Sequence, residues 1–138
     1  MKIAIIGSGI TGAVLGSLLP DAVVFERATH VGGRMTTRFL RESERFDIGS
    51  TVFKDKIHYI ENGIQKEFDF LKFLESKTHG LKIRPHKTYP ASFHSTSSMQ
   101  ELVEKLLVNS KVHLTHQADS ISKSHDQSQW ILSFTNGK

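Results

Sequence analysis

A glycine-rich turn between an apolar run and a helical pattern constrains the fold of this chain more than any other feature. The stretch reads "MKIAIIGSGITGAVLGSLLP". Lys2–Ile6 is short, apolar and rich in β-branched residues, which is typical of a buried parallel strand. Apolar residues then recur every fourth position, which predicts a helix over Gly9–Leu19. Ala22–Phe25 is a second apolar run, so the chain is expected to open with a compact βαβ unit.

An export signal is the alternative interpretation of the same stretch, because one lysine precedes apolar residues. A secretory signal needs an unbroken apolar region of ~7–15 residues. Here "GSG" interrupts the run directly after Ile6, and no clean small-residue cleavage site follows. No apolar run approaches the ~20 residues that cross a bilayer. The sequence therefore favours the glycine turn, and we expect no membrane segment.

Composition limits the remaining classes of protein. The chain has 138 residues, 38% hydrophobic and 23% charged, which suits one globular domain. It has no cysteine, which excludes disulfides, zinc–thiolate sites and thiol catalysis and fits a cytoplasmic location. The net charge of +4 is scattered, so no nucleic-acid surface is expected. His113 and His116 are predicted to face opposite sides of a strand, and no metal site is expected.

The glycine spacing Gly7-x-Gly9-x-x-Gly12 is the dinucleotide-binding fingerprint when it lies between a strand and a helix. The first glycine permits the tight turn, the second lets the backbone approach a pyrophosphate, and the third lets helix and strand pack closely. Unpaired N–H groups at the helix start attract the anion. Glu26 ends the second strand about 20 residues on, where a carboxylate accepts hydrogen bonds from a ribose. A packing turn with a surface Glu26 is the alternative.

A second glycine motif follows directly in "ATHVGGRMTTR". Gly32 and Gly33 let the backbone pass close to a bound group, and Arg34 can meet a phosphate with a forked contact. A polar loop with a surface arginine is the alternative. Residues 27–45 are predicted to be a loop, and Phe46–Phe53 a short strand or an extended segment around Gly49.

The rest of the chain is predicted from hydrophobic periodicity. A helix is expected over Ile64–Ser76, irregular or weakly β structure over Ile83–Phe93, and a strand at Val112–Thr115. Ser98 and Glu101 have the spacing of a capping box, and the helix that follows is expected to bury Met99, Leu102, Val103, Leu106 and Leu107. A hairpin over the region of Ile121 and Trp130–Thr135 is expected to place Trp130 in the core. The ending "TNGK" has the Asn-Gly signal of a hairpin turn, and a loose tail is the alternative.

Together "GSGITG", "VVFERATHVGGRMTTR" and "FDIGSTVF" resemble, in order and spacing, the start of the flavin amine-oxidase superfamily. The renalase-like proteins are the most similar group, and Thr11 and "GGRMTT" are renalase-like details. The resemblance is strong for residues 2–53. It resumes at "MQELVEKLL" and at the strand that bears Trp130.

The resemblance implies that the cofactor is FAD. The glycine turn would surround its pyrophosphate, Glu26 would hold the adenosine ribose, and Arg34 would lie at the pyrophosphate and ribityl linkage. The segment beside the flavin reads Gly-Ser-Thr-Val here, where relatives usually read Gly-Ala-Gln-Tyr. Ala118 falls where relatives often place a valine whose backbone meets the adenine. The predicted cofactor-binding residues are Gly7, Gly9, Ile10, Thr11, Gly12, Glu26, Arg27, Gly33, Arg34, Met35, Gly49, Ser50, Thr51, Val52 and Ala118.

The expected fold class is therefore α/β. We expect a Rossmann-like FAD-binding domain over residues 1–138, with a βαβ start, a parallel sheet and a β-hairpin or meander. Residues 54–95 would be an insertion toward the substrate side. Because relatives of this family are longer, their C-terminal half is absent and the domain is expected to be incomplete. A complementary chain or the missing region would cover strand 2–6, whose outer edge would otherwise be open.

By the same resemblance, the chain would be the FAD-binding portion of an oxidoreductase. Hydride would pass from a reduced nicotinamide or an amine to the flavin, which oxygen would reoxidise. No catalytic residue can be assigned. A non-catalytic dinucleotide-binding or interaction module and an NAD-binding domain are the alternatives.

Overall fold

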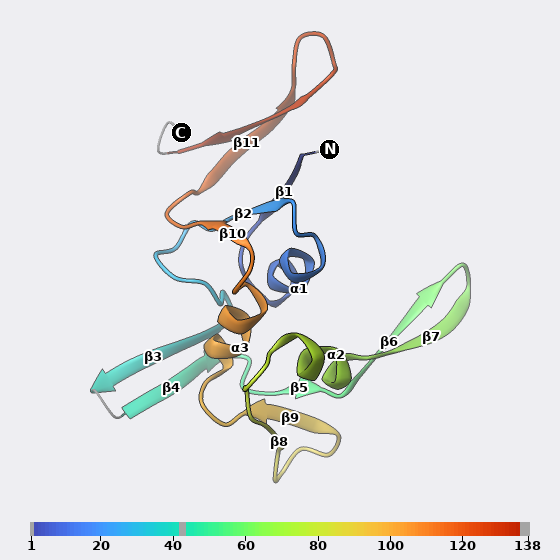
Figure 1. The fold of residues 1–138 in the computed structure, drawn as a ribbon, viewed down its shortest axis with the longest axis vertical. Coiled ribbons are helices and arrows are strands. Elements are labelled where there is room, and N and C mark those ends of the chain that lie inside the picture. Colours follow the sequence, from blue (N-terminus) through green and yellow to red (C-terminus); the bar gives the residue numbers. More distant parts are fainter. Residues whose placement is uncertain (1, 42–43, 136–138) are drawn as a thin grey trace.

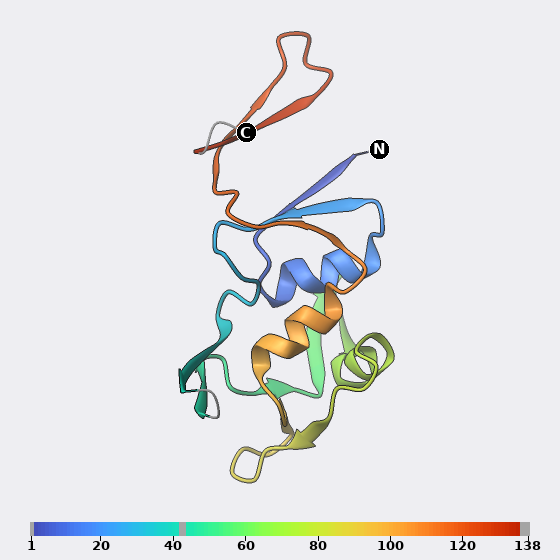
Figure 2. The same ribbon diagram turned by 60° about the vertical axis from the view of Figure 1, so that its left-hand side comes forward.

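The computed structural model describes residues 2–41 and 44–135 and contains a parallel sheet with hairpins around it (Figures 1 and 2). The helices of the described chain are α1 (Ile10–Leu18), α2 (Phe70–Lys77) and α3 (Met99–Leu106). Its strands are β1 (Ile3–Ile6), β2 (Ala22–Phe25), β3 (Met35–Arg41), β4 (Glu44–Gly49), β5 (Phe53–Lys54), β6 (Lys56–Glu61), β7 (Ile64–Asp69), β8 (Ile83–Pro85), β9 (Ser92–Ser95), β10 (Lys111–His113), β11 (Ala118–Lys123) and β12 (Trp130–Phe134).

The central sheet has the order β1-β2-β10, and all its pairs are parallel. Ile3 pairs with Ala22 and Lys111 with Val23, so β2 lies between its two neighbours. The βαβ unit expected at the start of the chain is confirmed, and with it the Rossmann-like α/β fold. In the described chain β1 pairs on one side only and forms an edge of this sheet.

One face of the sheet is covered by α1 and α3, which lie together on the same side of it (Figure 2). Ile5, Ala22 and Val24 point into this layer and are buried. The five apolar residues expected on the buried face of α3 are indeed in the core. Ser98 accepts a hydrogen bond from the Glu101 amide at 3.0 Å, as the capping spacing predicts.

Hairpins project from this centre in different directions (Figure 1). β3 pairs with β4, β6 with β7 and β11 with β12, and β9 lies between β5 and β8. None of the helices in residues 2–41 and 44–135 is long and apolar enough to cross a membrane. The Asn-Gly pair of the "TNGK" ending lies outside the described residues.

The predicted loop over residues 27–45 is wrong in its second half. Met35–Arg41 is a strand that pairs with β4, and Thr36 lies opposite Ile48. "MTTRFLR" contains β-branched and aromatic residues that suit a strand, but the glycines before it and the charges after it concealed this signal.

The predicted helix over Ile64–Ser76 is also wrong in its first half. Asn62 and Gly63 both have positive φ, 51° and 76°, so they form the tight turn of the β6–β7 hairpin. The helix begins only at Phe70, where Asp69 accepts a hydrogen bond from the Lys72 amide at 2.9 Å. The sequence contains both the Asn-Gly pair and the Asp69 cap, but the spacing of its apolar residues predicts one continuous helix.

Two further predictions are corrected near the end of the chain. Trp130 is not in the core, because 66% of it is exposed on β12. His113 and His116 do not face opposite sides, and their ring centroids are 5.3 Å apart. The strand ends at His113, and Thr115 has a φ of 58°, so the chain turns and brings both rings beside Phe25.

Candidate functional site

The glycine turn joins the end of β1 to the start of α1. The Gly7 amide donates to the Phe25 carbonyl at 2.8 Å and continues the sheet beyond β1. A Cβ on Gly12 would lie 2.0 Å from the Gly7 oxygen, so only glycine permits this approach of helix and turn. Gly9 is the N-cap of α1 and contributes no side-chain cap. A Cβ there would meet no atom within 4 Å, so the space in front of the helix start is open.

Glu26 fastens the end of β2 to this turn. One carboxylate oxygen accepts from the amide and the hydroxyl of Ser8 at 2.8 and 2.7 Å. The other accepts from the Ala28 amide at 2.8 Å. A carboxylate has about four acceptor positions, so these bonds leave one for a ribose hydroxyl. Glu26 is thus a structural residue as well as the expected ribose acceptor.

These bonds also set the charge state of Glu26, which is only 7% exposed. Burial on its own would raise the pKa of its carboxyl. The hydrogen bonds from Ala28 and Ser8 and the charge of Arg27 outweigh burial, and the pKa lies below its ordinary value of 4.5. The site therefore holds a buried carboxylate, which would repel a ribose phosphate and has an oxygen that can accept a hydrogen bond from a ribose hydroxyl.

The second glycine loop lies against the first. The Gly32 amide donates to the Ser8 carbonyl at 3.1 Å. A Cβ on Gly33 would lie 3.2 Å from the Gly9 Cα, so the two backbones nearly touch. The Met35 amide donates to the Gly32 carbonyl at 2.9 Å, which closes the loop as β3 begins.

Arg34 is the residue of this loop that contacts the end of β4 and the residue after it. The Ser50 amide donates to the Arg34 carbonyl at 2.8 Å. Gly49 has a φ of 100°, and a Cβ there would lie 2.3 Å from the same carbonyl oxygen. Among the described residues the Arg34 guanidinium makes no ion pair or hydrogen bond within the chain. Its charge is therefore free to meet an anion.

The β3–β4 hairpin is held to α3 by polar side chains. Thr37 donates its hydroxyl to Asp47 at 2.6 Å, and the same carboxylate oxygen accepts from the Met99 amide at 3.1 Å. The Thr37 amide donates to the Gln100 side chain at 3.0 Å. Asp47 therefore supports the start of α3, and the hairpin that carries Met35 is fixed relative to the core.

Two adjoining cavities surround the glycine turn. The glycine-turn pocket, of about 280 Å³, lies at the start of α1. The Glu26 pocket, of about 390 Å³, lies between the ends of β1 and β2 and the start of β11. Both are lined by Ile6, Gly7, Gly9 and Arg34, so one extended ligand can occupy both.

Most predicted cofactor residues line these two pockets. The glycine-turn pocket is lined by the predicted residues Gly7, Gly9, Ile10, Thr11, Gly12, Arg34, Met35 and Ser50. The Glu26 pocket adds Glu26, Arg27, Gly33 and Ala118. Gly49 lines a separate cavity with Arg34 and Arg38, and Val52 an apolar cleft beside α1. Thr51 is exposed and lines none of these cavities.

Sequence reasoning missed several residues of the site. Phe25, His116 and Gln117 line the Glu26 pocket, whereas Gly32, which the second glycine motif had indicated, lines the glycine-turn pocket. The His116 amide donates to the Glu26 carbonyl at 2.8 Å, and its ring lies 6.0 Å from that of Phe25. Nothing in the sequence marks this contact, because it depends on the turn at Thr115. Ser8 occupies a variable position of the glycine pattern, so its bond to Glu26 was also invisible.

The lowered pKa of Glu26 predicts an acid-sensitive fold. A carboxyl that holds its proton less tightly when folded stabilises the fold above its unfolded pKa. This contribution is lost as the pH falls through the lowered folded value. From about pH 5 downward, the free energy of unfolding of Glu26→Gln should therefore depend less steeply on pH than that of wild type. Urea denaturation across this range measures it, with the exposed Glu75→Gln as control. Equal slopes for Glu26→Gln and wild type would contradict this role.

Gly9 and Gly12 are expected to respond differently to alanine. Gly12→Ala forces a methyl against the Gly7 carbonyl and should destabilise the fold by about 1–3 kcal/mol. Gly9→Ala places its methyl in open space and should change stability by less than about 1 kcal/mol. It should nevertheless weaken ADP-ribose binding, because the methyl fills the approach to the helix start. Thermal unfolding and calorimetric titration separate the effects, and unchanged ADP-ribose affinity in Gly9→Ala would refute the assignment.

Comparisons with known proteins agree with this geometry. A family model described as an NAD(P)-binding Rossmann-like domain matches residues 5–62, the part that contains both glycine motifs. A 56-residue stretch is 41% identical to a 4,4'-diapophytoene desaturase (4,4'-diaponeurosporene-forming) of Staphylococcus aureus. That match covers 38% of this chain and 11% of the desaturase.

Three solved structures resemble nearly the whole chain. An oxidoreductase from Methanosarcina mazei matches with a TM-score of 0.58 and 11% identity, over 99% of this chain and 57% of that one. The Diels-Alderase PyrE3 matches with a TM-score of 0.56 and 14% identity, over 99% of this chain and 30% of that one. THI4 of Thermovibrio ammonificans matches with a TM-score of 0.53 and 18% identity, over 98% of this chain and 48% of that one. This chain thus spans less than two thirds of each. Together the family match and these likenesses show that the chain has a Rossmann-like dinucleotide-binding fold.

Proposed function

We propose that this chain is the FAD-binding portion of a flavin-dependent oxidoreductase of the renalase-like kind. The observation that carries the proposal is the contact of two glycine loops beside one unpaired arginine. The first loop presents the open start of α1, and the second brings Arg34 to the same pocket. The desaturase match and the oxidoreductase fold neighbour support this class. The absence of cysteine fits a cytoplasmic location, which is part of the proposal.

The residues present fit an FAD molecule. The amides at the start of α1 would hold the pyrophosphate, and a Cβ at Gly9 would fill the space it needs. Arg34 would neutralise a phosphate with forked N–H groups. Glu26 would accept a hydrogen bond from one ribose hydroxyl at its remaining acceptor position, in a pocket that Ala118 and His116 also line.

When bound, a flavin would accept hydride from a substrate and pass the electrons to oxygen. The chain itself would orient the cofactor and exclude water from it. The renalase resemblance points to a reduced nicotinamide or an amine as substrate. Residues 54–95 would form the substrate side, since β6, β7 and α2 line the apolar cleft beside the glycine-turn pocket.

Binding measurements test the cofactor. The purified chain should take up FAD and turn yellow, with absorbance near about 450 nm. Arg34→Gln should weaken FAD binding by about tenfold or more, because a hydrogen bond to a charged group contributes about 1.5–3 kcal/mol. Arg84→Gln, an exposed arginine on β8 outside these pockets, is the matched control. Uptake of ADP-ribose without FAD would instead support a non-catalytic module, and tighter binding of NAD than of FAD an NAD-binding domain.

We propose further that another polypeptide segment, from a complementary chain or a longer form of this one, pairs with the free edge of β1. An unpaired apolar edge strand presents N–H and C=O groups that bind other strands. The sheet face away from α1 is open as well. Ile6 is 55% exposed there, and a groove of about 490 Å³ separates this face from the β11–β12 hairpin.

An open edge predicts that the isolated chain associates with itself. Ala4 is exposed on this face of β1, so Ala4→Lys should reduce association by placing a charge there. Ala91→Lys, a change at an exposed alanine in a loop, should not. Sedimentation velocity over a range of concentrations measures the effect. A wild-type chain that stays monomeric and stable would refute the uncovered edge.

A further inference from the structure

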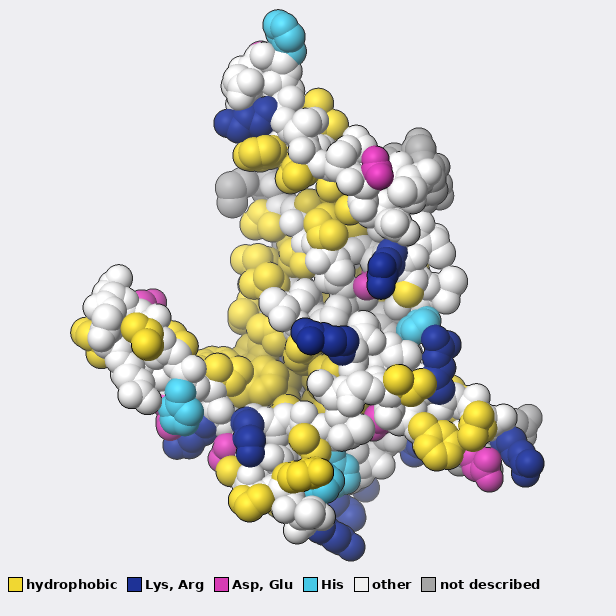
Figure 3. Space-filling view, turned by 180° about the vertical axis from the view of Figure 1, so that it is seen from behind, with side chains coloured by type: hydrophobic (Ala, Val, Ile, Leu, Met, Phe, Trp, Pro, Cys, Tyr) yellow, Lys and Arg dark blue, Asp and Glu magenta, His cyan; other side chains and the backbone are white. Residues whose placement is uncertain are grey.

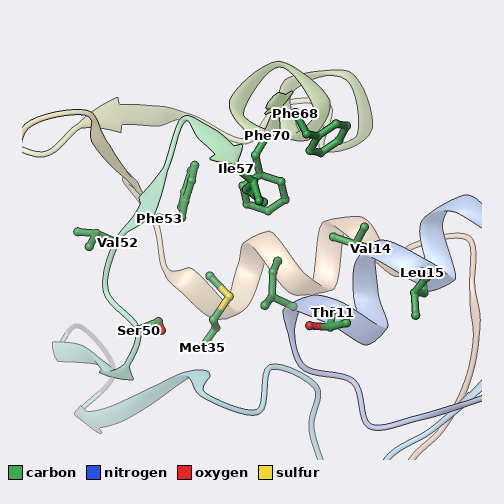
Figure 4. A pocket seen from close by; sticks show the side chains of 11 residues that line it. Thr11, Val14, Leu15, Met35, Ser50, Val52, Phe53, Ile57, Phe68 and Phe70 are labelled. Atoms are coloured by element: carbon green, nitrogen blue, oxygen red, sulfur yellow. The ribbon is translucent and has the colours of Figure 1, made fainter. Parts of the chain in front are cut away.

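An apolar cleft of about 370 Å³ opens directly beside the glycine-turn pocket. Its floor is the outer side of α1, with Thr11, Val14 and Leu15, and its opposite wall comes from β5 to α2 (Figure 4). Four residues line both cavities: Ile10, Thr11, Met35 and Ser50. A molecule in the cleft therefore lies next to whatever extends from the glycine turn.

The lining of the cleft is almost entirely apolar. No charged side chain lines it within the described residues, and its only polar side chains are those of Thr11 and Ser50. Aromatic rings form the wall opposite α1: Phe53 and Phe70 are edge to face at 5.8 Å, and Phe68 lies 6.5 Å from Phe70. Met35 and Phe70 are buried, at 4% and 8% exposure, and both belong to the hydrophobic core.

This lining discriminates between classes of ligand. An ammonium group that enters the cleft loses its hydration and finds no carboxylate, which costs free energy. An uncharged apolar or aromatic group exchanges water for contacts with the phenylalanine rings and gains free energy. The volume falls in the range of about 300–1,000 Å³ that small-molecule sites occupy.

We propose that this cleft is the substrate site, and that it takes an uncharged apolar or aromatic molecule rather than a protonated amine. The proposal rests on the proposed flavin function, which requires a substrate site beside the cofactor. Of the two substrate kinds that the renalase resemblance suggests, it disfavours the cationic one. The cleft also lies within a wider band of exposed hydrophobic side chains that runs toward the β11–β12 hairpin (Figure 3). A polypeptide that covers the band is the competing occupant.

Competition with an uncharged dye tests the ligand class. Nile red should bind the purified chain with increased fluorescence. At pH 7, benzyl alcohol should displace it at lower concentration than benzylamine, which is then an ammonium ion. Val14→Asp places a carboxylate in the cleft without touching either nucleotide pocket. It should weaken Nile red binding by about tenfold and reverse the order of the two competitors.

Leu40→Asp is the matched control, because Leu40 is 70% exposed on β3 and lies outside all of these cavities. It should change Nile red binding by less than about twofold. If circular dichroism shows that Val14→Asp is unfolded, Leu15→Asp makes the same test at a residue that is 42% exposed.

Three results would overturn the proposal. The first is wild-type affinity for Nile red in a folded Val14→Asp or Leu15→Asp variant. The second is stronger displacement of the dye by benzylamine than by benzyl alcohol in the wild-type chain. The third is exclusion of the dye by a polypeptide that pairs with β1. FAD affinity is measured on the same samples. Failure of FAD binding with intact Nile red binding would reject the flavin function and leave the apolar site. Loss of the Nile red result with intact FAD binding would reject only the substrate class.

Discussion

The bond between Glu26 and Ser8 is the interaction on which the site depends. It joins the end of β2 to the glycine turn, and the Ser8 carbonyl in turn accepts from Gly32. The first glycine turn is thereby connected, through one buried serine, to the end of β2 and to the second glycine loop. Buried polar groups are costly unless each is paired. Among the described residues no buried side-chain polar atom lacks a partner, so this arrangement is fixed rather than adjustable.

Missing Cβ atoms determine how closely the segments approach around that bond. A Cβ on Gly12 or Gly49 would lie only 2.0 or 2.3 Å from a backbone carbonyl oxygen. The first approach brings α1 against its own turn, and the second brings the end of β4 against Arg34. Because both are backbone contacts, no side-chain movement can relieve a substitution. The approach of the segments around the two pockets is therefore set by the backbone, while Glu26, Arg27 and Arg34 supply charges to their lining.

The apolar surfaces around the two pockets are exposed. Parallel sheets are usually buried on both faces. Here α1 and α3 cover one face, whereas the other looks across an open groove toward the β11–β12 hairpin, and Trp130 is exposed beside it. The apolar cleft beside α1 is continuous with the same band of hydrophobic side chains (Figure 3). The two glycine loops are thus held together by hydrogen bonds within the chain, whereas the apolar surfaces around them are exposed.

The sequence by itself determined the βαβ start, because that unit depends on contacts between near neighbours. Apolar runs, glycine spacing and a carboxylate at the end of β2 are local signals, and they predicted β1, α1 and β2 to within one residue at each end. The cap and the buried face of α3 were also predicted, because both depend on residues that are close together in the sequence. At Asn62 and Gly63 the turn signal competed with the helical spacing of the apolar residues that follow. That spacing predicted a helix, whereas the chain forms a hairpin there.

Only the tertiary structure decided which residues meet. The Glu26–Ser8 bond, the approach of Gly49 to Arg34 and the position of His116 beside Phe25 join segments whose distance depends on every turn between them. Burial is decided in the same way. The alternation of Trp130, Leu132 and Phe134 predicted a strand with an apolar side, but a pattern cannot say whether that side is covered. In the folded chain it faces a groove, and Trp130 is exposed because the hairpin stands away from the sheet.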